Sequence, residues 1–366
     1  MGSDQSGERM VEAMRVDAAI GSLLGTAVGD AIGLPYEGLA PLRAARMLGP
    51  PTRHRLLPGW GMVSDDTEHA CAVAAAVVES GGRLPAFTRS LARRLRWWFA
   101  AMPPGTGLAT AKACIRLWLG APPERSGVRS AGNGPAMRAA ILGACIDDPD
   151  QLRALVEAST LITHRDPRAF QGALAVALAA RMAKEGETVD PRSYASAIDA
   201  CPDLGGTEMA ERIAVAAASV GRGDPSTLFA ASEGHRHGVS GFILHTVPIA
   251  IHCWLRHQGD LRGAVDAAVR CGGDTDTTAA IAGGIVGAGV GPGGVPVDWL
   301  AGLLGWPRTV AWMEELGVRA AKAARSGAAG VAPTYAWYGT WPRNMALLGV
   351  VLAHGARRLL PPYGWE

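Results

Sequence analysis

The segment CGGDTDTTAAIAGGIVGAGVG, residues 271–291, combines two acids with a body of almost only small residues. Asp274 and Asp276 flank Thr275, and Thr277 follows directly. Capping accounts for one acid at a helix start, because its oxygen accepts hydrogen bonds from free amides and the helix dipole favours negative charge there. Two acids exceed what capping needs. The Gly and Ala body predicts a helix that packs closely on its neighbours and so fixes its acidic start in place.

The hydropathy pattern of the whole chain predicts helices. Apolar residues recur at three- and four-residue spacing in runs such as EHACAVAAAVVES, whereas alternating runs rich in Val, Ile and Thr are missing. We therefore predict an all-α fold, a compact orthogonal bundle of many helices. The predicted helices cover residues 15–33, 66–80, 86–101, 107–119, 135–146, 150–163, 167–184, 192–200, 206–220, 240–256, 260–270, 276–289, 307–325 and 343–358. The 48 glycines predict short distances between helix axes.

Composition limits the classes of partner. With 366 residues and 48% hydrophobic content, the chain can bury a large core. A net charge of +2 from scattered residues forms no basic stripe, so we predict no nucleic-acid partner. The apolar run 345–353 has half the length that a bilayer needs, so we predict no membrane segment. Six cysteines without CxxC spacing predict a reduced, cytoplasmic protein, and we expect a monomer or weak homo-oligomer.

The chain divides into three predicted parts. We expect residues 1–12 to be disordered, residues 13–328 to form one helical domain, and residues 329–366 to form an aromatic-rich C-terminal extension with one short helix. The extension follows a hinge of small residues, RSGAAGVAP. Its aromatic and leucine side chains either dock on the core or form a contact with a partner, and the pattern leaves both possibilities open.

A second acidic helix start lies in GMVSDDTEHA, residues 61–70. Ser64, Asp65 and Asp66 precede an alanine-rich helix, so capping again explains one acid and not both. Hydroxyl and carboxylate oxygens form a donor set suited to hard cations such as Mg²⁺, Mn²⁺ or Ca²⁺. In GDAIGLPYEG, residues 29–38, a helix ends near Asp30 and Glu37, which taken alone is an ordinary helix C-terminus.

These acids predict more than one cation if both helix starts and Glu37 converge. Five carboxylates in one site repel each other and raise several pKa values unless cations neutralise them. Two divalent ions supply four positive charges. The charge balance therefore favours a binuclear centre with oxygen ligands, which can hold and activate a water.

Two further segments offer contacts to an anion. In SAGNGPAMRAAILG, residues 130–143, Gly132, Asn133 and Gly134 lead into a predicted helix, and a glycine turn at a helix start can present free amides to phosphate. The same pattern is typical of an ordinary loop-to-helix junction, and Pro135 removes one donor. His164 follows a predicted helix, where it either compensates the helix dipole or contacts a ligand.

Taken in order, these segments resemble the ADP-ribosylglycohydrolase family. The match runs through GSLLGTAVGDAIGLPYEG, SDDTEHA, GNGPAMRAA, ITHRDPRAFQGALA and GGDTDTTAAIAGGIVGA, from about residue 15 to 325, and leaves the extension outside. The resemblance implies a compact all-α fold with two Mg²⁺ or Mn²⁺ ions, and hydrolysis of the bond between ADP-ribose and an acceptor. The implied metal ligands are Ser64, Asp65, Asp66, Asp274, Asp276 and Thr277. The implied contacts to ADP-ribose are Ser130, Gly132, Asn133, Gly134, Met137 and His164.

The chemistry of the ribosyl bond adds a mechanism to this resemblance. Cleavage builds oxocarbenium character on the sugar, so the site must stabilise that charge while water attacks the anomeric carbon. The expected nucleophile is a metal-bound water deprotonated with help from a carboxylate. We expect Asp65 or Asp274 to be the assisting base, with Glu37 as the next candidate.

Three functions stay open at this point. The first is removal of ADP-ribose from a protein side chain, arginine or serine. The second is the same chemistry on a small riboside or nucleoside. The third is a catalytically silent relative that binds ADP-ribose. The complete set of acids argues against the third, because carboxylates that no cation neutralises destabilise a fold.

Overall fold

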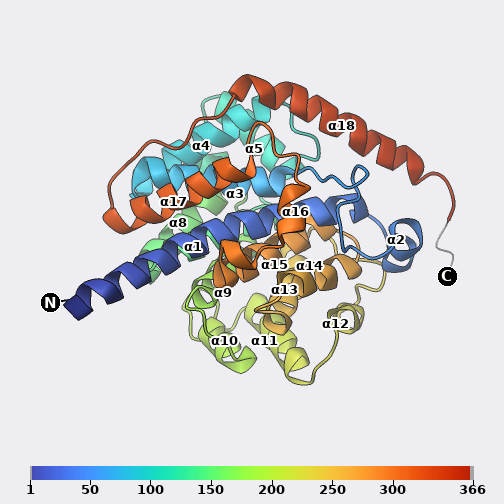
Figure 1. Cartoon of the computed structure of the whole chain (residues 1–366), viewed down its shortest axis with the longest axis horizontal. Helices are drawn as coiled ribbons and strands as arrows, with labels where there is room; N and C mark the ends of the chain where they lie inside the picture. Colours follow the sequence, from blue (N-terminus) through green and yellow to red (C-terminus); the bar gives the residue numbers. More distant parts are fainter. Residues whose placement is uncertain (1, 363–366) are drawn as a thin grey trace.

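All regular secondary structure in the part that the computed structural model describes, residues 2–362, is helical (Figure 1). Side chains are described from Glu12 onward, and residues 363–366 of the expected extension lie outside the described residues. Within residues 2–362 the structure contains isolated β-bridges but no β-strand, which confirms the predicted all-α fold.

The elements follow one another in short connections. The helices are α1 (Gly2–Gly33), α2 (Pro41–Leu48), α3 (Asp65–Ser80), α4 (Leu84–Ala100), α5 (Leu108–Trp118), α6 (Pro123–Ser126), α7 (Ala140–Cys145), α8 (Pro149–Leu161), α9 (Pro167–Ala183), α10 (Pro191–Asp199), α11 (Glu208–Gly221), α12 (Ser226–Ser232), α13 (Ile243–Arg256), α14 (Leu261–Arg270), α15 (Thr275–Val290), α16 (Val297–Ala301), α17 (Val310–Ser326) and α18 (Thr340–Arg357). Short 3-10 turns cover Leu34–Tyr36, Ala136–Arg138, Pro292–Gly294 and Trp337–Gly339.

Helices α1 and α15 form the centre of the molecule. In Figure 1, α1 crosses the middle of the fold, with α3, α4 and α17 on one side and α9 to α15 on the other. The two helices touch through their backbones, because a Cβ added to Gly25 would lie 2.1 Å from the carbonyl oxygen of Gly283. The predicted close packing of the Gly and Ala body is therefore found, and its main partner is α1.

The apolar character of α1 is that of a core helix. The window within Glu12–Tyr36 is long and apolar enough to cross a membrane by length and composition, yet all of it is buried inside the protein. The helix runs back to Gly2, through residues 2–12 for which we expected disorder.

The predicted continuous helix over residues 135–146 is wrong. A 3-10 turn at Ala136–Arg138 precedes α7, and the amides of Ala139 and Leu142 bond to carbonyls three residues back. This irregular backbone buries Arg138 completely. Its guanidinium donates to Ser159 and Thr163. The break, which the apolar pattern did not predict, therefore lies at a buried arginine whose guanidinium must find hydrogen-bond partners inside the protein.

The C-terminal extension docks on the core, and α18 crosses the upper edge of the molecule in Figure 1. Asn344 donates to the carbonyl of Ala101 at 2.8 Å, and His354 bonds to the carbonyl of Leu56 at 2.7 Å. Leu347 is buried in a small apolar cluster. These contacts fix the extension beside the start of α3.

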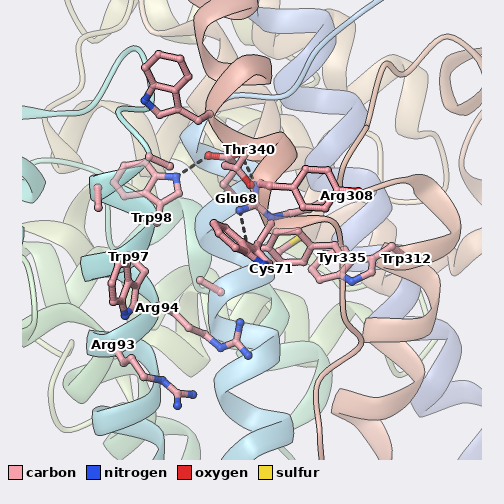
Figure 2. Close-up of a pocket in the computed structure, with 16 residues that line it drawn as sticks. Glu68, Cys71, Arg93, Arg94, Trp97, Trp98, Arg308, Trp312, Tyr335 and Thr340 are labelled. Atoms are coloured by element: carbon pink, nitrogen blue, oxygen red, sulfur yellow. Dashed lines mark hydrogen bonds and ion pairs between the residues drawn. The ribbon is translucent and has the colours of Figure 1, made fainter.

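Glu68 on α3 is the main polar anchor of this region, as Figure 2 shows. Its carboxylate accepts from Arg308 at 2.5 Å, from Arg343 of the extension at 3.3 Å and from the Trp98 indole at 2.5 Å. Burial would raise the pKa of Glu68, but the two arginines outweigh it and hold the pKa below its usual value. The anchor borders an aromatic cavity of about 760 Å³, whose wall includes Trp97.

Candidate active site and metal centre

The two acidic helix starts meet in space. Ser64 caps α3, accepting from the amide of Asp66 at 3.3 Å, and Asp274 stands at the cap position of α15. The hydroxyl of Thr277 on α15 donates to Oδ2 of Asp66 on α3 at 3.3 Å. Ser64 donates to the same oxygen at 3.1 Å. A contact between residues 211 positions apart thus joins the two motifs.

Asp30 on α1 completes this cluster, and sequence reasoning did not assign it a role in the site. Its Oδ2 accepts from the Ser64 amide at 2.8 Å, from the Thr67 amide at 3.2 Å and from the Thr67 hydroxyl at 2.5 Å. Asp30 therefore caps α3 from a different helix. The available signal was an acid within the apolar run GTAVGDAIG, although its position near a helix end made it look like an ordinary terminus.

Three buried carboxylates have the geometry of a cation site. One oxygen each of Asp30, Asp66 and Asp276 lie within 4.8 Å of one another. The Oδ1 atom of each is buried without a hydrogen-bond partner. Such orphaned acceptors are costly unless a cation or proton satisfies them. The donor set is all oxygen, so the residues present fit a hard divalent cation.

The pKa values of this cluster are raised. Burial raises the pKa of Asp30 to about 6, against the hydrogen bonds from Thr67 and Ser64 that lower it. Burial and neighbouring carboxylates also raise the pKa values of Asp66 and Asp276 well above the ordinary range. Negative charges held close together in a site with little water favour a bound cation for the same physical reason.

Three further acids lie close to the cluster and line the adjoining cleft. Asp65 is half-buried at the first position of α3, and burial and the charge of Asp30 raise its pKa. Asp274 accepts from the side-chain amide of Asn133 at 2.6 Å. Glu37 is exposed at the rim, and limited hydration and the charge of Asp274 raise its pKa.

A glycine junction places Glu37 beside the start of α15. The amide of Gly38 donates to the Gly273 carbonyl at 2.7 Å, and the amide of Gly273 donates to the Leu39 carbonyl at 3.0 Å. Gly273 has φ +77°, and a Cβ there would lie 2.0 Å from the Val239 carbonyl oxygen. Glycine is therefore required at this crossing.

These residues line one cleft of about 600 Å³. Of the residues predicted for the site, the cleft is lined by Glu37, Ser64, Asp65, Ser130, Gly132, Asn133, Gly134, Met137, His164, Asp274, Asp276 and Thr277. Asp66 is buried next to Thr277 and Ser64 and does not line the cleft. The structure thus brings together side chains from five widely separated segments of the chain.

The GNG loop differs from the predicted anion cradle. The Asn133 amide donates to the Gly241 carbonyl at 3.0 Å, and the Gly132 amide donates to Ser130 Oγ at 3.3 Å. No α-helix starts directly after Gly134, because a 3-10 turn follows. The expected free amides at 132 and 133 are therefore already bonded, and the Asn133 side chain positions Asp274.

His164 packs against this loop. A Cβ on Gly132 would lie 3.1 Å from His164 Nε2, and one on Gly134 would lie 3.1 Å from Cε1. Burial, and then the charge of Arg138, lower the pKa of His164 to about 3, so the ring is neutral. Arg138 donates to Thr163 Oγ1, whose own hydrogen can then go to His164 Nδ1 at 2.9 Å. This network favours the proton on Nε2, at the side of the glycine loop.

Comparison with known proteins agrees with this geometry. The sequence model of the ADP-ribosylglycohydrolase family matches residues 11–329. The ADP-ribosyl-[dinitrogen reductase] glycohydrolase of Rhodospirillum rubrum is 27% identical over 299 residues, which cover 78% of this chain and 90% of the relative. The human ADP-ribosylhydrolase ARH3 is 26% identical over 331 residues, which cover 79% of this chain and 90% of the relative.

A solved structure gives the same answer for the fold. A chain described as an ADP-ribosylglycohydrolase-related protein complex superposes with a TM-score of 0.61 at 26% identity, covering 85% of this chain and 99% of its own. The family match spans both acidic helix starts and the GNG loop, and it ends before α18. The chain therefore belongs to the ADP-ribosylglycohydrolase family of hydrolytic enzymes.

Proposed function

We propose that this chain hydrolyses the bond between ADP-ribose and an acceptor on a protein side chain, an arginine or a serine, in a reaction that depends on divalent cations. One observation carries the proposal: the orphaned oxygens of Asp30, Asp66 and Asp276 lie together beside a cleft of about 600 Å³. Membership of the family supplies the reaction class.

The proposed centre holds two Mg²⁺ or Mn²⁺ ions. Asp30, Asp66 and Asp276 would hold the deeper part of the centre, and the remaining oxygens come from Ser64, Asp65, Asp274 and Thr277. When bound, the ions would offset the carboxylate charge and supply Lewis acidity toward ribose hydroxyls and a water. Asn133 keeps Asp274 oriented toward this centre through its 2.6 Å hydrogen bond.

The side chains of the cleft would perform the remaining steps. Asp65 lines the cleft at the first position of α3, where its carboxylate could accept a proton from the attacking water. Glu37 lies at the rim, where it can meet the acceptor side of the bond. His164 would donate from Nε2 to the diphosphate or the distal ribose, together with the Ser130 hydroxyl, and the glycine loop would line the ligand without donating its bonded amides at 132 and 133.

The test is release of free ADP-ribose from peptides that carry ADP-ribosyl-arginine or ADP-ribosyl-serine. We expect release with Mg²⁺ or Mn²⁺, loss of release after chelation, and recovery on adding the cation back. Asp276→Asn keeps the side-chain shape and removes one charge, so we expect at least a hundredfold loss of rate and weaker Mn²⁺ binding by equilibrium dialysis.

Asp298→Asn is the matched control, because Asp298 pairs with Arg262 at the surface. This variant should retain both activity and Mn²⁺ binding. Release that persists at full rate after chelation would overturn the metal dependence. Absence of release from both peptides with Mn²⁺ bound would overturn a protein side chain as acceptor, and a small riboside would then be assayed.

A further inference from the structure

The C-terminal extension forms one wall of the cleft. Leu347 and Val351 of α18 line it beside Leu34. Leu347 is 2% exposed and packs with Leu56 and Met62, so this wall is a fixed part of the core surface. Residues 330–362 lie beyond the segment that the family model matches. The wall therefore comes from outside the matched segment.

The same extension brings a positive charge close to the segment that carries Glu37. Arg358 follows α18 directly, and its Nη2 donates to the Pro35 carbonyl at 3.1 Å. Its Nη1 lies 3.7 Å from the position that a Cβ on Gly38 would occupy. The guanidinium therefore lies over the segment that carries Glu37. No ion pair forms between Arg358 and Glu37 among the described side chains, but the charge of Arg358 offsets part of the rise in the pKa of Glu37.

Arg358 is held in place by the core. Arg43 donates to the Arg358 carbonyl, and the Arg358 amide bonds to the His354 carbonyl at 3.0 Å. His354 in turn bonds to the Leu56 carbonyl. The Arg358 guanidinium is thus attached to a backbone that is hydrogen-bonded to the core.

This wall faces the acceptor if the proposed function holds. Leu347 packs with Leu34, and Arg358 bonds to the Pro35 carbonyl, so α18 lies beside the segment that carries Glu37, the residue proposed to meet the acceptor. The acceptor that leaves from the anomeric carbon would then meet Leu347 and Val351, with the charge of Arg358 behind the segment that carries Glu37. A cationic guanidinium acceptor finds a like charge there and an apolar surface that cannot hydrogen-bond to it.

We propose that the C-terminal extension selects the acceptor, admitting ADP-ribose that is linked through oxygen to an uncharged group and disfavouring ADP-ribose linked to an arginine guanidinium. The proposal rests on the proposed hydrolase function and narrows its substrate class. The carboxylates that could attract a guanidinium are those assigned to the cations, apart from Glu37, and Arg358 offsets the charge of Glu37. Arg358 and Val351 are the specificity-determining residues.

The first test compares two peptides of one sequence, modified on serine or on arginine, with the full-length enzyme and Mn²⁺. We expect the wild type to cleave the serine-linked peptide at least tenfold faster in kcat/KM. Arg358→Gln should lower this preference about three- to tenfold, mainly through a smaller KM for the arginine-linked peptide. Arg358→Lys should keep the preference. Arg357→Gln is the matched control, because Arg357 points to the Pro361 carbonyl at the surface.

A second pair of variants tests the wall by adding a charge. Val351→Glu places a carboxylate in the cleft and should raise kcat/KM for the arginine-linked peptide severalfold. Leu352→Glu makes a comparable change at the next residue, which is 63% exposed, and should leave both substrates unaffected. Affinity for free ADP-ribose, measured by calorimetry, should be unchanged in all variants, which shows that the rest of the site is intact.

The outcomes separate the two proposals. Cleavage of both peptides with a preference that Arg358→Gln and Val351→Glu leave unchanged would overturn acceptor selection and leave the hydrolase function standing. A wild-type preference for the arginine-linked peptide would overturn acceptor selection as well. Cleavage of neither peptide would overturn both proposals.

Discussion

Asp30 serves two purposes through its two carboxylate oxygens. Oδ2 accepts the amides and hydroxyl at the start of α3, and Oδ1 stays without a partner beside Asp66 and Asp276. The first set of contacts fixes the residues that follow Ser64. The second leaves an acceptor for a cation. Asp30 therefore both fixes the start of α3 and adds a negative charge to the carboxylate cluster.

Replacing Asp30 by Asn tests the second purpose. The amide oxygen of Asp30→Asn can still cap α3, but one negative charge is lost, so we expect at least a tenfold weaker affinity for Mn²⁺ with the helical content retained. Equilibrium dialysis and circular dichroism measure the two properties. Asp17→Asn, at an exposed position of the same helix, is the control. Unchanged Mn²⁺ affinity would limit Asp30 to its capping role.

A buried histidine predicts how stability depends on pH. His252 is fully buried, bonds to Ser226 and Ser219, and stacks on Phe229. Burial, and then the charge of Arg256, lower its pKa from 6.5 to about 4. The unfolded chain therefore binds a proton that the folded chain does not between these values. The free energy of unfolding should fall by about 3 kcal/mol through His252 as the pH drops from above 6.5 to below 4.

The measurement is denaturant unfolding of the wild type and of His252→Gln at several pH values. The difference in unfolding free energy between them should shrink by about 2 kcal/mol between pH 7 and pH 4.5. His237→Gln changes an exposed histidine and should follow the wild type throughout. A difference that is constant with pH would show that His252 titrates normally in the folded protein.

Most residues of the cleft could be predicted from the residue types and their spacing in the sequence, but the role of Asp30 could not. Repeated acids at two helix starts pointed to Asp66 and Asp276, which the structure does bring together. Asp30 caps a helix whose N-cap residue, Ser64, follows 34 residues later, and a local pattern cannot reveal such a contact. Asn133 shows the same limit, because the loop predicted a ligand contact but not the hydrogen bond from its side-chain amide to Asp274, 141 residues away.

At the scale of elements, the seam between α1 and α15 determines the site. Gly25 meets Gly283 and Gly21 meets Gly287 with backbone against backbone. Asp276 stands at the end of this seam, where a Cβ on Gly33 would lie 2.6 Å from the Asp276 Cα atom. The distance between Asp30 and Asp276 therefore depends on the absence of side chains along two helices.

Gly25→Ala should damage both the fold and the centre. Its Cβ would lie 2.1 Å from a backbone oxygen, so the helices must separate, at a cost of about 3 kcal/mol in unfolding free energy, and Mn²⁺ affinity should fall with it. Gly349→Ala is the matched change in α18, because no atom lies within 4 Å of its added Cβ. That variant should be at least as stable as the wild type, since alanine favours helix. Equal losses in both would rule out the seam as the cause.

The helical pattern was most informative for long elements. The predicted helices over 66–80 and 167–184 correspond to α3 and α9 within a residue or so at each end. The short helices α2, α6, α12 and α16 were not predicted, because segments of this length carry less than three turns of periodicity. Pro41 begins α2 at a position where proline is favourable, because the first helical residue needs no amide hydrogen.

At the scale of the whole molecule, Glu68 connects the shared fold to the extension. It lies two residues after Asp66 on α3 and binds Arg308 before the extension and Arg343 within it. Arg343 also donates to the Val63 carbonyl, next to Ser64. The extension, the aromatic cavity of Figure 2 and the start of α3 therefore share one buried ion-pair cluster.

Glu68→Gln should loosen this connection. Two buried arginines would lose their negative partner, so we expect a loss of about 3–5 kcal/mol in unfolding free energy and faster proteolysis within residues 327–340. Glu79→Gln is the control on the same helix, where Glu79 pairs with Arg93 and Arg94 near the surface. There the expected loss is below about 1 kcal/mol. Similar losses in the two variants would contradict a special role for Glu68.

The backbone contact of α1 with α15 also dictates an order of events. The carboxylate cluster stands at the end of a seam where the two backbones touch, and its Asp276 lines the cleft that we assign to ADP-ribose. A cation that enters through this cleft would arrive before the substrate and depart after the product. Exchange of Mn²⁺ should therefore become slow when ADP-ribose is bound, and the substrate should trap the cation that it needs.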